Sequence, residues 1–280
     1  MPAPGHLAPL LTVRPIVLWV EDSLTKEYLS RIWSPDDKLF NILIGGGNET
    51  IRGIVLDLRT QGYSHIFGLV DRDFRDSNQP RWPNPGVNVF VPDFFEMENY
   101  LFSWPALAGC KENRLQRTEA EVQRQAESLA QGMTWWMACR QVLSNYRDRL
   151  IGDFPKHPTI DNIQSLSDAE NYVKGQEWYR DIQSRAAGIG EDSALSSDLS
   201  SAHSDQQEKL SAGRWVQEFS GKEIFRRIRG FLFNESYASP SEMDVDLAKA
   251  VADWQAENKQ IPVELIKLRD ILKNRVGLSN

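Results

Sequence analysis

The sequence predicts an α/β protein, in which a parallel sheet with flanking helices is followed by a mostly helical C-terminal portion. Over roughly the first hundred residues, short apolar runs alternate with helical periodicity, which is typical of parallel strands joined by helical crossovers. Beyond about residue 103 only helical periodicity remains. We therefore expect an α/β core over residues 1–104 and a helical portion over residues 105–280.

Four short apolar runs are expected to form the strands of the sheet. They comprise residues 16–20, 40–44, 66–70 and 87–91. Each run has the length of a strand and is bounded by acids or turn residues. Helical spacing follows the first run until Ser34-Pro35, and follows the second from Asn48 to Gly62. Right-handed crossovers through these helices would make the strands parallel.

The remaining chain is expected to be helical, with one segment of weak pattern. Residues 114–150 predict two long amphipathic helices, with Trp135, Trp136 and Met137 on the apolar side as core residues. Residues 215–233 and 243–276 also show helical periodicity, separated by a turn containing Ser239-Pro240. Residues 186–211 are rich in Ser, Ala and Gly, which indicates a mobile segment or a poorly packed helix without chemistry of its own.

Composition limits the function classes. With 280 residues, 41% of them hydrophobic, the chain can bury a full core. Its 39 acids against 32 bases give a net charge of -7, which argues against coating nucleic acid by bulk attraction, so a nucleic-acid site must be local. The two cysteines and four histidines show no metal-ligand spacing, which fits a reducing cytoplasm. No secretion signal or membrane span is evident, so we expect a cytoplasmic protein with no membrane partner.

Acidic residues gather where the predicted strands end. Glu21 follows the first strand, Asp71 and Asp73 follow the third, and Asp93, Glu96 and Glu98 follow the fourth. A single such acid is more often a solvated loop residue or a helix cap. Three groups at the carboxyl edge of one parallel sheet, where ligands bind in open α/β folds, favour a shared site. Crowded carboxylates raise one another's pKa unless a cation neutralises them, and their hard oxygens suit Mg²⁺ or Mn²⁺.

Other phosphate and metal motifs fit less well. An EF-hand loop beginning at Asp71 would need Asp or Asn where Arg75 stands and Gly where Asp76 stands. The three glycines Gly45 to Gly47 lack the rest of a dinucleotide or P-loop motif, so they are interpreted as a turn. A haloacid-dehalogenase phosphatase carries its Asp-x-Asp after the first strand instead, with Thr or a similar residue where Arg75 sits.

A response-regulator receiver domain is the strongest alternative. Val20-Glu21-Asp22-Ser23 resembles the first-strand acidic pair of such domains, and Asp71 would be the phosphoacceptor. A receiver domain should then have Ser or Thr at the end of the fourth strand. Here residues 92–98 bring Pro and further acids instead.

Glu21 after one strand and Asp71-Arg72-Asp73 after a later strand match the arrangement of the Toprim domain. Four segments together resemble the stand-alone Toprim-like, OLD-related nucleases, a group that includes the Toprim effector subunit of PARIS anti-phage defence systems. They are Val20-Glu21, Gly45-Gly46-Gly47, Val70-Asp71-Arg72-Asp73-Phe74 and Glu96-Met97-Glu98-Asn99-Tyr100-Leu101. Gly221-Lys222-Glu223-Ile224-Phe225 is similar to the Gly-Lys segment in the helical part of these proteins.

The resemblance implies a Mg²⁺-dependent (or Mn²⁺-dependent) Toprim endonuclease, a toxic antiviral effector acting on RNA, with host tRNA favoured over DNA. Glu21, Asp71, Asp73 and Lys222 are the implied catalytic residues, and Glu21, Asp71, Asp73 and Glu98 are the expected metal ligands. If the segment after the fourth strand continues the strand, Glu96 and Glu98 share one face. If it is helical, only one of them can face the metal, and Glu98 is favoured. Thr25 stands where related sequences have an acid, so one metal position is built differently here.

The expected partners follow from the same reasoning. Arg226 and Arg227 are candidate phosphate contacts within a basic run, although a solvated helix face accounts for them equally well. The chain has no ATP-binding motif, so the resemblance implies a separate ABC-type ATPase subunit. A homodimer of the active chain is compatible with this expectation. The alternative function is a receiver-like or Toprim-derived signalling or binding module that docks a partner through the same edge and hydrolyses nothing.

Overall fold

The computed structural model describes residues 11–72, 74, 87–147, 162–176, 179–180, 192–233 and 240–278. The chain forms two compact units, of which one comprises Met1–Gln123 and Gly221–Asn280 and the other comprises Arg124–Ser220. The predicted α/β class, with a mostly helical C-terminal part, is confirmed. The division differs from the expected boundary at residue 104, because the last sixty or so residues return to the unit that contains the sheet.

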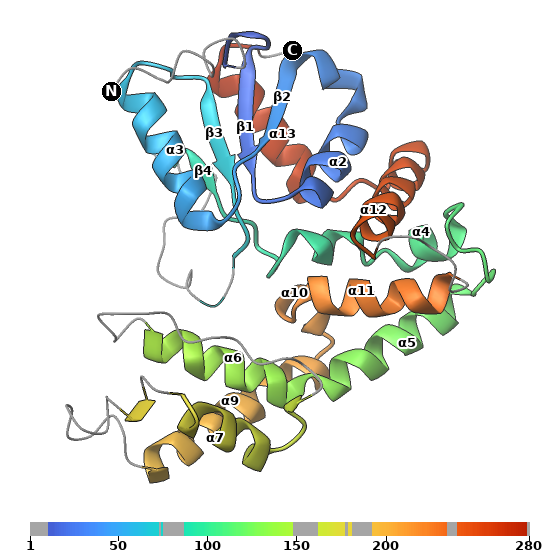
Figure 1. The fold of residues 1–280 in the computed structure, drawn as a ribbon. Helices are drawn as coiled ribbons and strands as arrows, with labels where there is room; N and C mark the ends of the chain where they lie inside the picture. Colours follow the sequence, from blue (N-terminus) through green and yellow to red (C-terminus); the bar gives the residue numbers. More distant parts are fainter. Residues whose placement is uncertain are drawn as a thin grey trace. The chain divides into compact units, whose positions relative to one another are not determined.

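The sheet has four parallel strands in the order β2-β1-β3-β4 (Figure 1). They are β1 (Ile16–Val20), β2 (Phe40–Ile44), β3 (Ile66–Leu69) and β4 (Val89–Phe90). All five residues of β1 are buried, as expected for a central strand covered on both faces. β3 and β4 are shorter than the apolar runs that predicted them, so the expected parallel sheet is confirmed with its last strand reduced to two residues.

Helices α2 (Ser23–Ile32) and α3 (Asn48–Thr60) connect the first three strands. The two crossovers run in opposite directions along the sheet, so right-handed connections place these helices on opposite faces. On the α3 face, Ile51 and Val55 pack against Val17, Trp19 and neighbouring apolar residues in one buried cluster. A 3-10 helix, η1 (Ser34–Leu39), follows α2 where Pro35 was expected only to end the helix.

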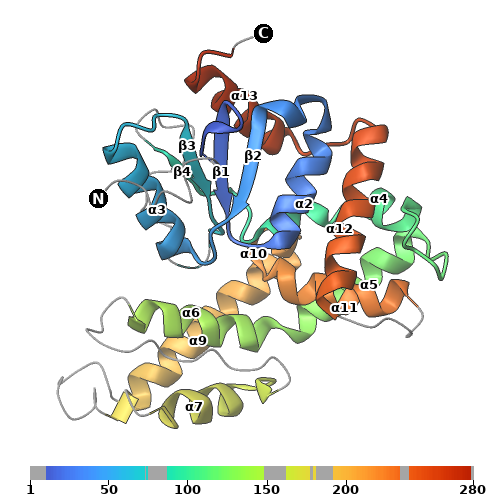
Figure 2. The same ribbon diagram turned by 45° about the horizontal axis from the view of Figure 1, so that its top comes forward.

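The other helices of this unit lie at the carboxyl ends of the strands or on the side of the sheet that α2 covers. They include η3 (Met97–Leu101), α4 (Trp104–Gly109), α11 (Gly221–Leu232), α12 (Pro240–Glu257) and α13 (Val263–Arg275). Helix α12 lies alongside α2 (Figures 1 and 2). Their contact includes a buried hydrogen bond in which the Tyr28 hydroxyl donates to Gln255 Oε1 at 2.7 Å.

Two of the predicted helices are each divided in the structure. The expected helix over residues 215–233 is interrupted at Phe219-Ser220, which separates α10 (Trp215–Glu218) from α11. The expected helix over residues 243–276 is interrupted before Pro262, because proline cannot continue a helix from the residues before it.

The second unit is built from α6 (Thr134–Arg147), α7 (Leu166–Lys174), α9 (Asp192–Ser211) and α10, and α5 (Glu119–Gly132) leads into it. Helices α6, α7 and α9 pack on one another. Trp136 and Met137 are buried as predicted, while Trp135 is half-buried and stacks on the His203 ring at 3.6 Å between centroids.

The segment over residues 186–211 was expected to be mobile or a poorly packed helix. From Asp192 onward it is helical, as α9, and it buries Leu195 and Leu199 completely, so it is packed more closely than expected. Its apolar stripe is narrow and made partly of small residues, which is why the sequence pattern looked weak. Residues 186–191 lie outside the described residues.

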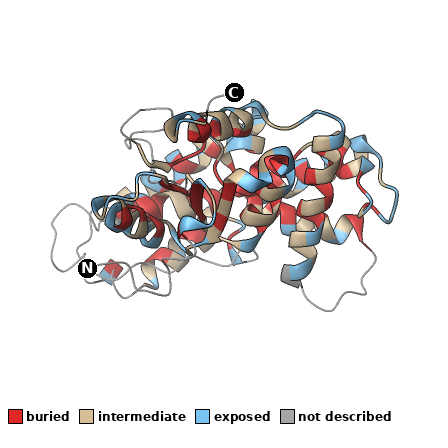
Figure 3. Ribbon diagram, turned by 90° about the horizontal axis from the view of Figure 1, so that it is seen from above, coloured by how far each residue is buried: buried red, intermediate tan, exposed pale blue. Residues whose placement is uncertain are grey.

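Buried positions concentrate in the strands and along one side of each flanking helix (Figure 3). Among the described helices, none combines the length and the apolar character that crossing a bilayer requires.

Candidate active site at the carboxyl edge of the sheet

The carboxyl ends of β1 and β3 bring Glu21 and Asp71 together. Because the two strands are parallel neighbours, the residues that follow them meet at the same edge. The backbone N–H of Asp71 donates a hydrogen bond to Glu21 Oε1 at 3.0 Å. These two acids, fifty residues apart in sequence, are therefore direct neighbours, as the sequence predicted.

The segment after β4 adds to the same edge. The N–H of Met97 donates to Asp71 Oδ1 at 2.9 Å, which fixes the start of η3 beside the end of β3. Glu96 is the residue before η3 and has extended backbone angles, whereas Glu98 lies within the helical turn. Both side chains are buried, with 5% and 2% of the residue exposed. The acids that follow three different strands thus converge.

Helix α11 begins directly against η3. The N–H of Lys222 donates to Glu96 Oε2 at 2.8 Å. Gly221 makes this approach possible, because a Cβ there would lie 2.7 Å from the backbone nitrogen of Asn99. The Gly-Lys pair is thereby placed at the acidic edge, although more than half of the chain separates it from β1 in sequence.

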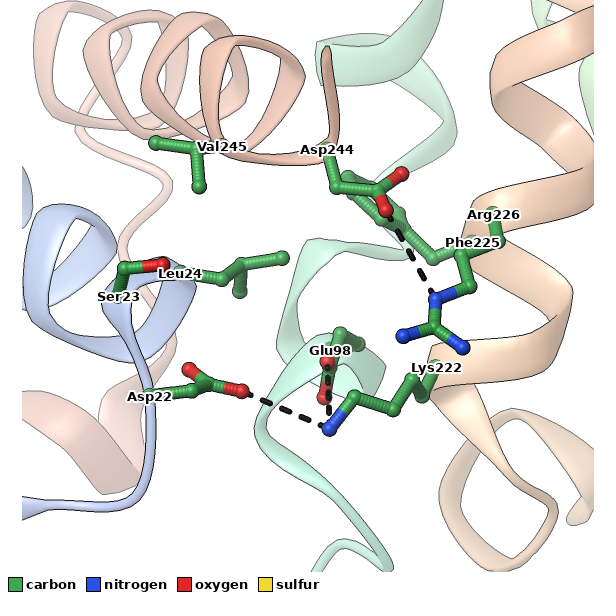
Figure 4. A pocket seen from close by; sticks show the side chains of 9 residues that line it. All are labelled: Asp22, Ser23, Leu24, Glu98, Lys222, Phe225, Arg226, Asp244 and Val245. Atoms are coloured by element: carbon green, nitrogen blue, oxygen red, sulfur yellow. Dashed lines mark ion pairs between the residues drawn. The ribbon is translucent and has the colours of Figure 1, made fainter. Parts of the chain in front are cut away.

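The ammonium group of Lys222 lies between two acids (Figure 4). Its Nζ is 3.5 Å from Asp22 Oδ2 and 3.8 Å from Glu98 Oε1. Asp22 also caps helix α2, since its Oδ1 accepts the N–H of Thr25 at 2.8 Å. The three charged groups border a pocket of about 230 Å³. Its lining residues are Asp22, Ser23, Leu24, Glu98, Lys222, Phe225, Arg226, Asp244 and Val245.

The acids of this site repel one another. Burial raises the pKa of Asp71 well above its usual range, the neighbouring Glu98, Glu96 and Glu21 raise it further, and Lys222 offsets only part of this effect. Burial likewise raises the pKa of Glu98 to about 8 against the attraction of Lys222, with Glu96 and Asp22 adding repulsion. The ionised forms of these acids are therefore incompletely stabilised by the protein's own cation.

The lysine responds in the opposite sense. Burial would lower the pKa of the Lys222 ammonium, but attraction by Glu98, Asp22, Asp71 and Glu96 outweighs burial and raises that pKa above its usual value. Lys222 is thus held as a cation at neutral pH. A permanently charged ammonium can stabilise an anion in the pocket, but it cannot act as a base there.

The arginines of the basic run occupy different surroundings. Arg226 lines the pocket, and its guanidinium lies 3.8 Å from Asp244 Oδ2 and 3.3 Å from Glu223 Oε1. Arg227 is half-buried on the same helix and is not among the pocket residues. Arg214 belongs to the other unit, where it pairs with Glu208 and Glu218.

The donor chemistry of this edge suits a hard divalent cation. Glu21, Asp71 and Glu98 offer carboxyl oxygens, and the raised pKa values of Asp71 and Glu98 indicate charge that a cation would relieve. One hydrogen bond does not exhaust a carboxylate, which offers about four acceptor positions. Within the described residues, however, no three His, Cys, Asp or Glu side chains already form a metal-holding group. Asp73, the fourth expected ligand, lies outside the described residues.

Two members of the site were not assigned by the sequence reasoning. The sequence places Asp22 in an acidic pair with Glu21 and near Thr25, but gives no signal of its contact with Lys222. Glu96 is a candidate metal ligand by sequence, whereas in the structure it forms a reciprocal capping box with Asn99. Glu followed by Asn three residues later departs from the usual capping-box pattern, so the sequence carries no clear signal of this helix start.

Comparison with known proteins identified no relative: the chain matches no family model, no curated protein and no solved structure.

Proposed function

We propose that this protein is a Mg²⁺-dependent nuclease whose active site is the carboxyl edge of the sheet. The observation that carries the proposal is the placement of the Lys222 ammonium 3.5 Å from Asp22 and 3.8 Å from Glu98, within the electrostatic reach of Asp71. Clustered acids whose ionised forms repel one another, beside a cation that stays protonated, are groups that can bind a metal ion and stabilise a phosphodiester during hydrolysis. The resemblance of the acidic motifs to Toprim-like, OLD-related nucleases supports the same reaction.

In this proposal the residues of the site have different roles. Glu21, Asp71 and Glu98, with Asp73, would hold Mg²⁺, which supplies charge neutralisation and a lowered pKa for an attacking water. Lys222 would stabilise the charge that develops on the phosphoryl oxygens, and Arg226 would bind a flanking phosphate through the pocket that it shares with Lys222. Asp22 would hold the ammonium in place, because its carboxylate is anchored by capping α2.

The substrate class and partners rest on the resemblance alone. It favours RNA, and tRNA in particular, as the substrate of a toxic defence effector, with a separate ABC-type ATPase subunit as the regulatory partner. The net charge of -7 favours binding of nucleic acid through a few local basic residues rather than through a broad basic surface.

The test is a cleavage assay with purified protein, tRNA or single-stranded DNA, and Mg²⁺, Mn²⁺ or EDTA. Asp71→Asn keeps the acceptor for the Met97 N–H but lacks the charge, so it should abolish cleavage while circular dichroism remains unchanged. Lys222→Ala should lower turnover roughly 100-fold, the usual scale of a lost transition-state contact. Lys111→Ala, at an exposed lysine outside the pocket, is the matched control and should cleave normally.

A wild-type protein that cleaves neither substrate with either metal, or an Asp71→Asn variant as active as the wild type, would overturn the nuclease proposal. The first result would favour a binding module that docks a partner through this edge.

A further inference from the structure

We infer that Glu96 is a positioning residue that sets Lys222 by holding the first turn of helix α11, and that it is not a metal ligand. This inference rests on the proposed function only for its catalytic consequence. The two neighbouring acids of η3 would then have separate tasks, with Glu96 binding the backbone of Lys222 and Glu98 facing its ammonium.

The carboxyl group of Glu96 is used by two helix starts. In the capping box of η3 it accepts the backbone N–H of Asn99, and Asn99 Oδ1 accepts the N–H of Glu96 at 2.9 Å in return. Its Oε2 also accepts the N–H of Lys222 at 2.8 Å. Helix N-termini leave such N–H groups without partners inside the helix, and they attract negative charge. A buried carboxylate at this point therefore joins η3 to α11.

Close packing allows only one placement of the start of α11 against η3. Gly221 precedes Lys222, and a Cβ at that position would lie 2.5 Å from Asn99 Oδ1 and 2.7 Å from the Asn99 nitrogen. The helix start can therefore approach η3 only with glycine at this position. Because the Lys222 backbone is fixed by this contact and by Glu96, its side chain extends from a defined origin toward Asp22 and Glu98 (Figure 4).

Glu96 and Glu98 face different groups, although Glu96 lies close enough to Asp71 and Glu98 to raise the pKa of both. The carboxyl group of Glu96 accepts backbone N–H groups from two neighbouring elements. Glu98 instead presents Oε1 to the Lys222 ammonium and lines the pocket, which Glu96 does not. The backbone explains why the two side chains face different groups. Glu96 has extended angles and lies before the helical turn, whereas Glu98 lies inside the turn.

Hydrogen exchange tests the positioning without any substrate. In Glu96→Ala, amides in the first turn of α11 should exchange roughly 10- to 100-fold faster, the scale for loss of a hydrogen bond to a charged acceptor. Glu96→Gln keeps an acceptor oxygen and should restore most of the protection. Glu98→Gln, at the other acid of η3, is the matched control and should leave these amides protected. Unchanged exchange in Glu96→Ala would refute the inference.

Kinetics then separate positioning from metal binding. If Glu96 acts through Lys222, Glu96→Ala should lower kcat with little change in KM, and it should lower kcat no further in a Lys222→Ala background. Glu96→Gln should recover most of the turnover, because the amide still accepts the Lys222 N–H. A Gln variant that remains inactive until Mg²⁺ is greatly increased would identify Glu96 as a ligand and overturn the inference.

The two proposals fail in different ways. A wild-type protein without nuclease activity would end the proposed function, while the exchange experiment would still decide whether Glu96 holds the start of α11. If Glu96→Ala does not fold, Glu96→Asp takes its place, because its shorter side chain withdraws the acceptor from the Lys222 N–H. Glu96→Asp should lose α11 protection that Glu98→Asp retains, and equal protection in these two variants would overturn the inference.

Discussion

The carboxyl group of Glu98 should make the protein less stable as pH rises through the neutral range. Its pKa is raised by burial from 4.5 to about 8, so between these pH values the unfolded chain releases a proton that the folded chain retains. The unfolding free energy then falls by about 1.4 kcal/mol per pH unit. Over the difference of 3.5 units (8 minus 4.5), the upper bound for this single group is about 5 kcal/mol.

The variant Glu98→Gln isolates this contribution, because the carboxamide has nearly the same shape and does not titrate. Urea unfolding of both proteins in EDTA, at pH values from about 5 to 8, gives the free energies. The wild type should lose stability relative to the variant across this range, with no further divergence above about pH 8. Asp71 is present in both proteins, but Glu98 raises its pKa, so the difference reports Glu98 together with its coupling to Asp71. Parallel stability curves for the two proteins would refute the reasoning.

Three further predictions concern stability and reactivity. Gly221→Ala should destabilise the protein by about 1–3 kcal/mol in urea unfolding, because the added Cβ overpacks the contact with Asn99. Gly230→Ala on the same helix, where a Cβ meets nothing within 4 Å, should be neutral or stabilising. Equal effects of the two substitutions would contradict the packing argument. Tyr28→Phe should cost about 1–3 kcal/mol by the same measurement, because a buried acceptor loses its donor. Both cysteines are buried, and burial raises their thiol pKa values, to about 12 for Cys139. A thiol reagent at about pH 8 should therefore label them only after the protein unfolds. Stoichiometric labelling of the native protein would contradict this prediction.

The sheet could be predicted because its strands carry a strong local signal. Ile16–Val20 and Phe40–Ile44 match the predicted strands residue for residue. The central strand β1 is buried on both faces and needs its unbroken apolar sequence, whereas the edge strand β2 buries Phe40 and Ile42 in alternation. The fourth strand was overestimated, because β-pairing depends on a neighbouring strand and only Val89 and Phe90 find one in β3. The order of the strands could not be predicted, since it depends on packing between elements that are distant in sequence.

The site was predictable where it follows from strand ends and less so elsewhere. Glu21 and Asp71 meet because parallel strands end at the same edge, a rule that needs no structure. The position of Lys222 at the acidic edge was expected from family resemblance, since no local pattern links residues so far apart. The role of Asp22 as a partner of Lys222 depends on the tertiary position of α11, which the sequence did not predict.

The route of the chain through its two units has a consequence for synthesis. The unit that holds the site is made from residues 1–123 and 221–280, with the helical unit of residues 124–220 inserted between them. A nascent chain on the ribosome therefore carries Glu21, Asp71 and Glu98 long before it carries Lys222, and at that stage it lacks α12, which packs on α2. Such contacts of high sequence separation form late and slow folding. An unfinished chain cannot complete this edge, so a premature stop after the sheet leaves a product without the lysine and without the helix that packs on α2.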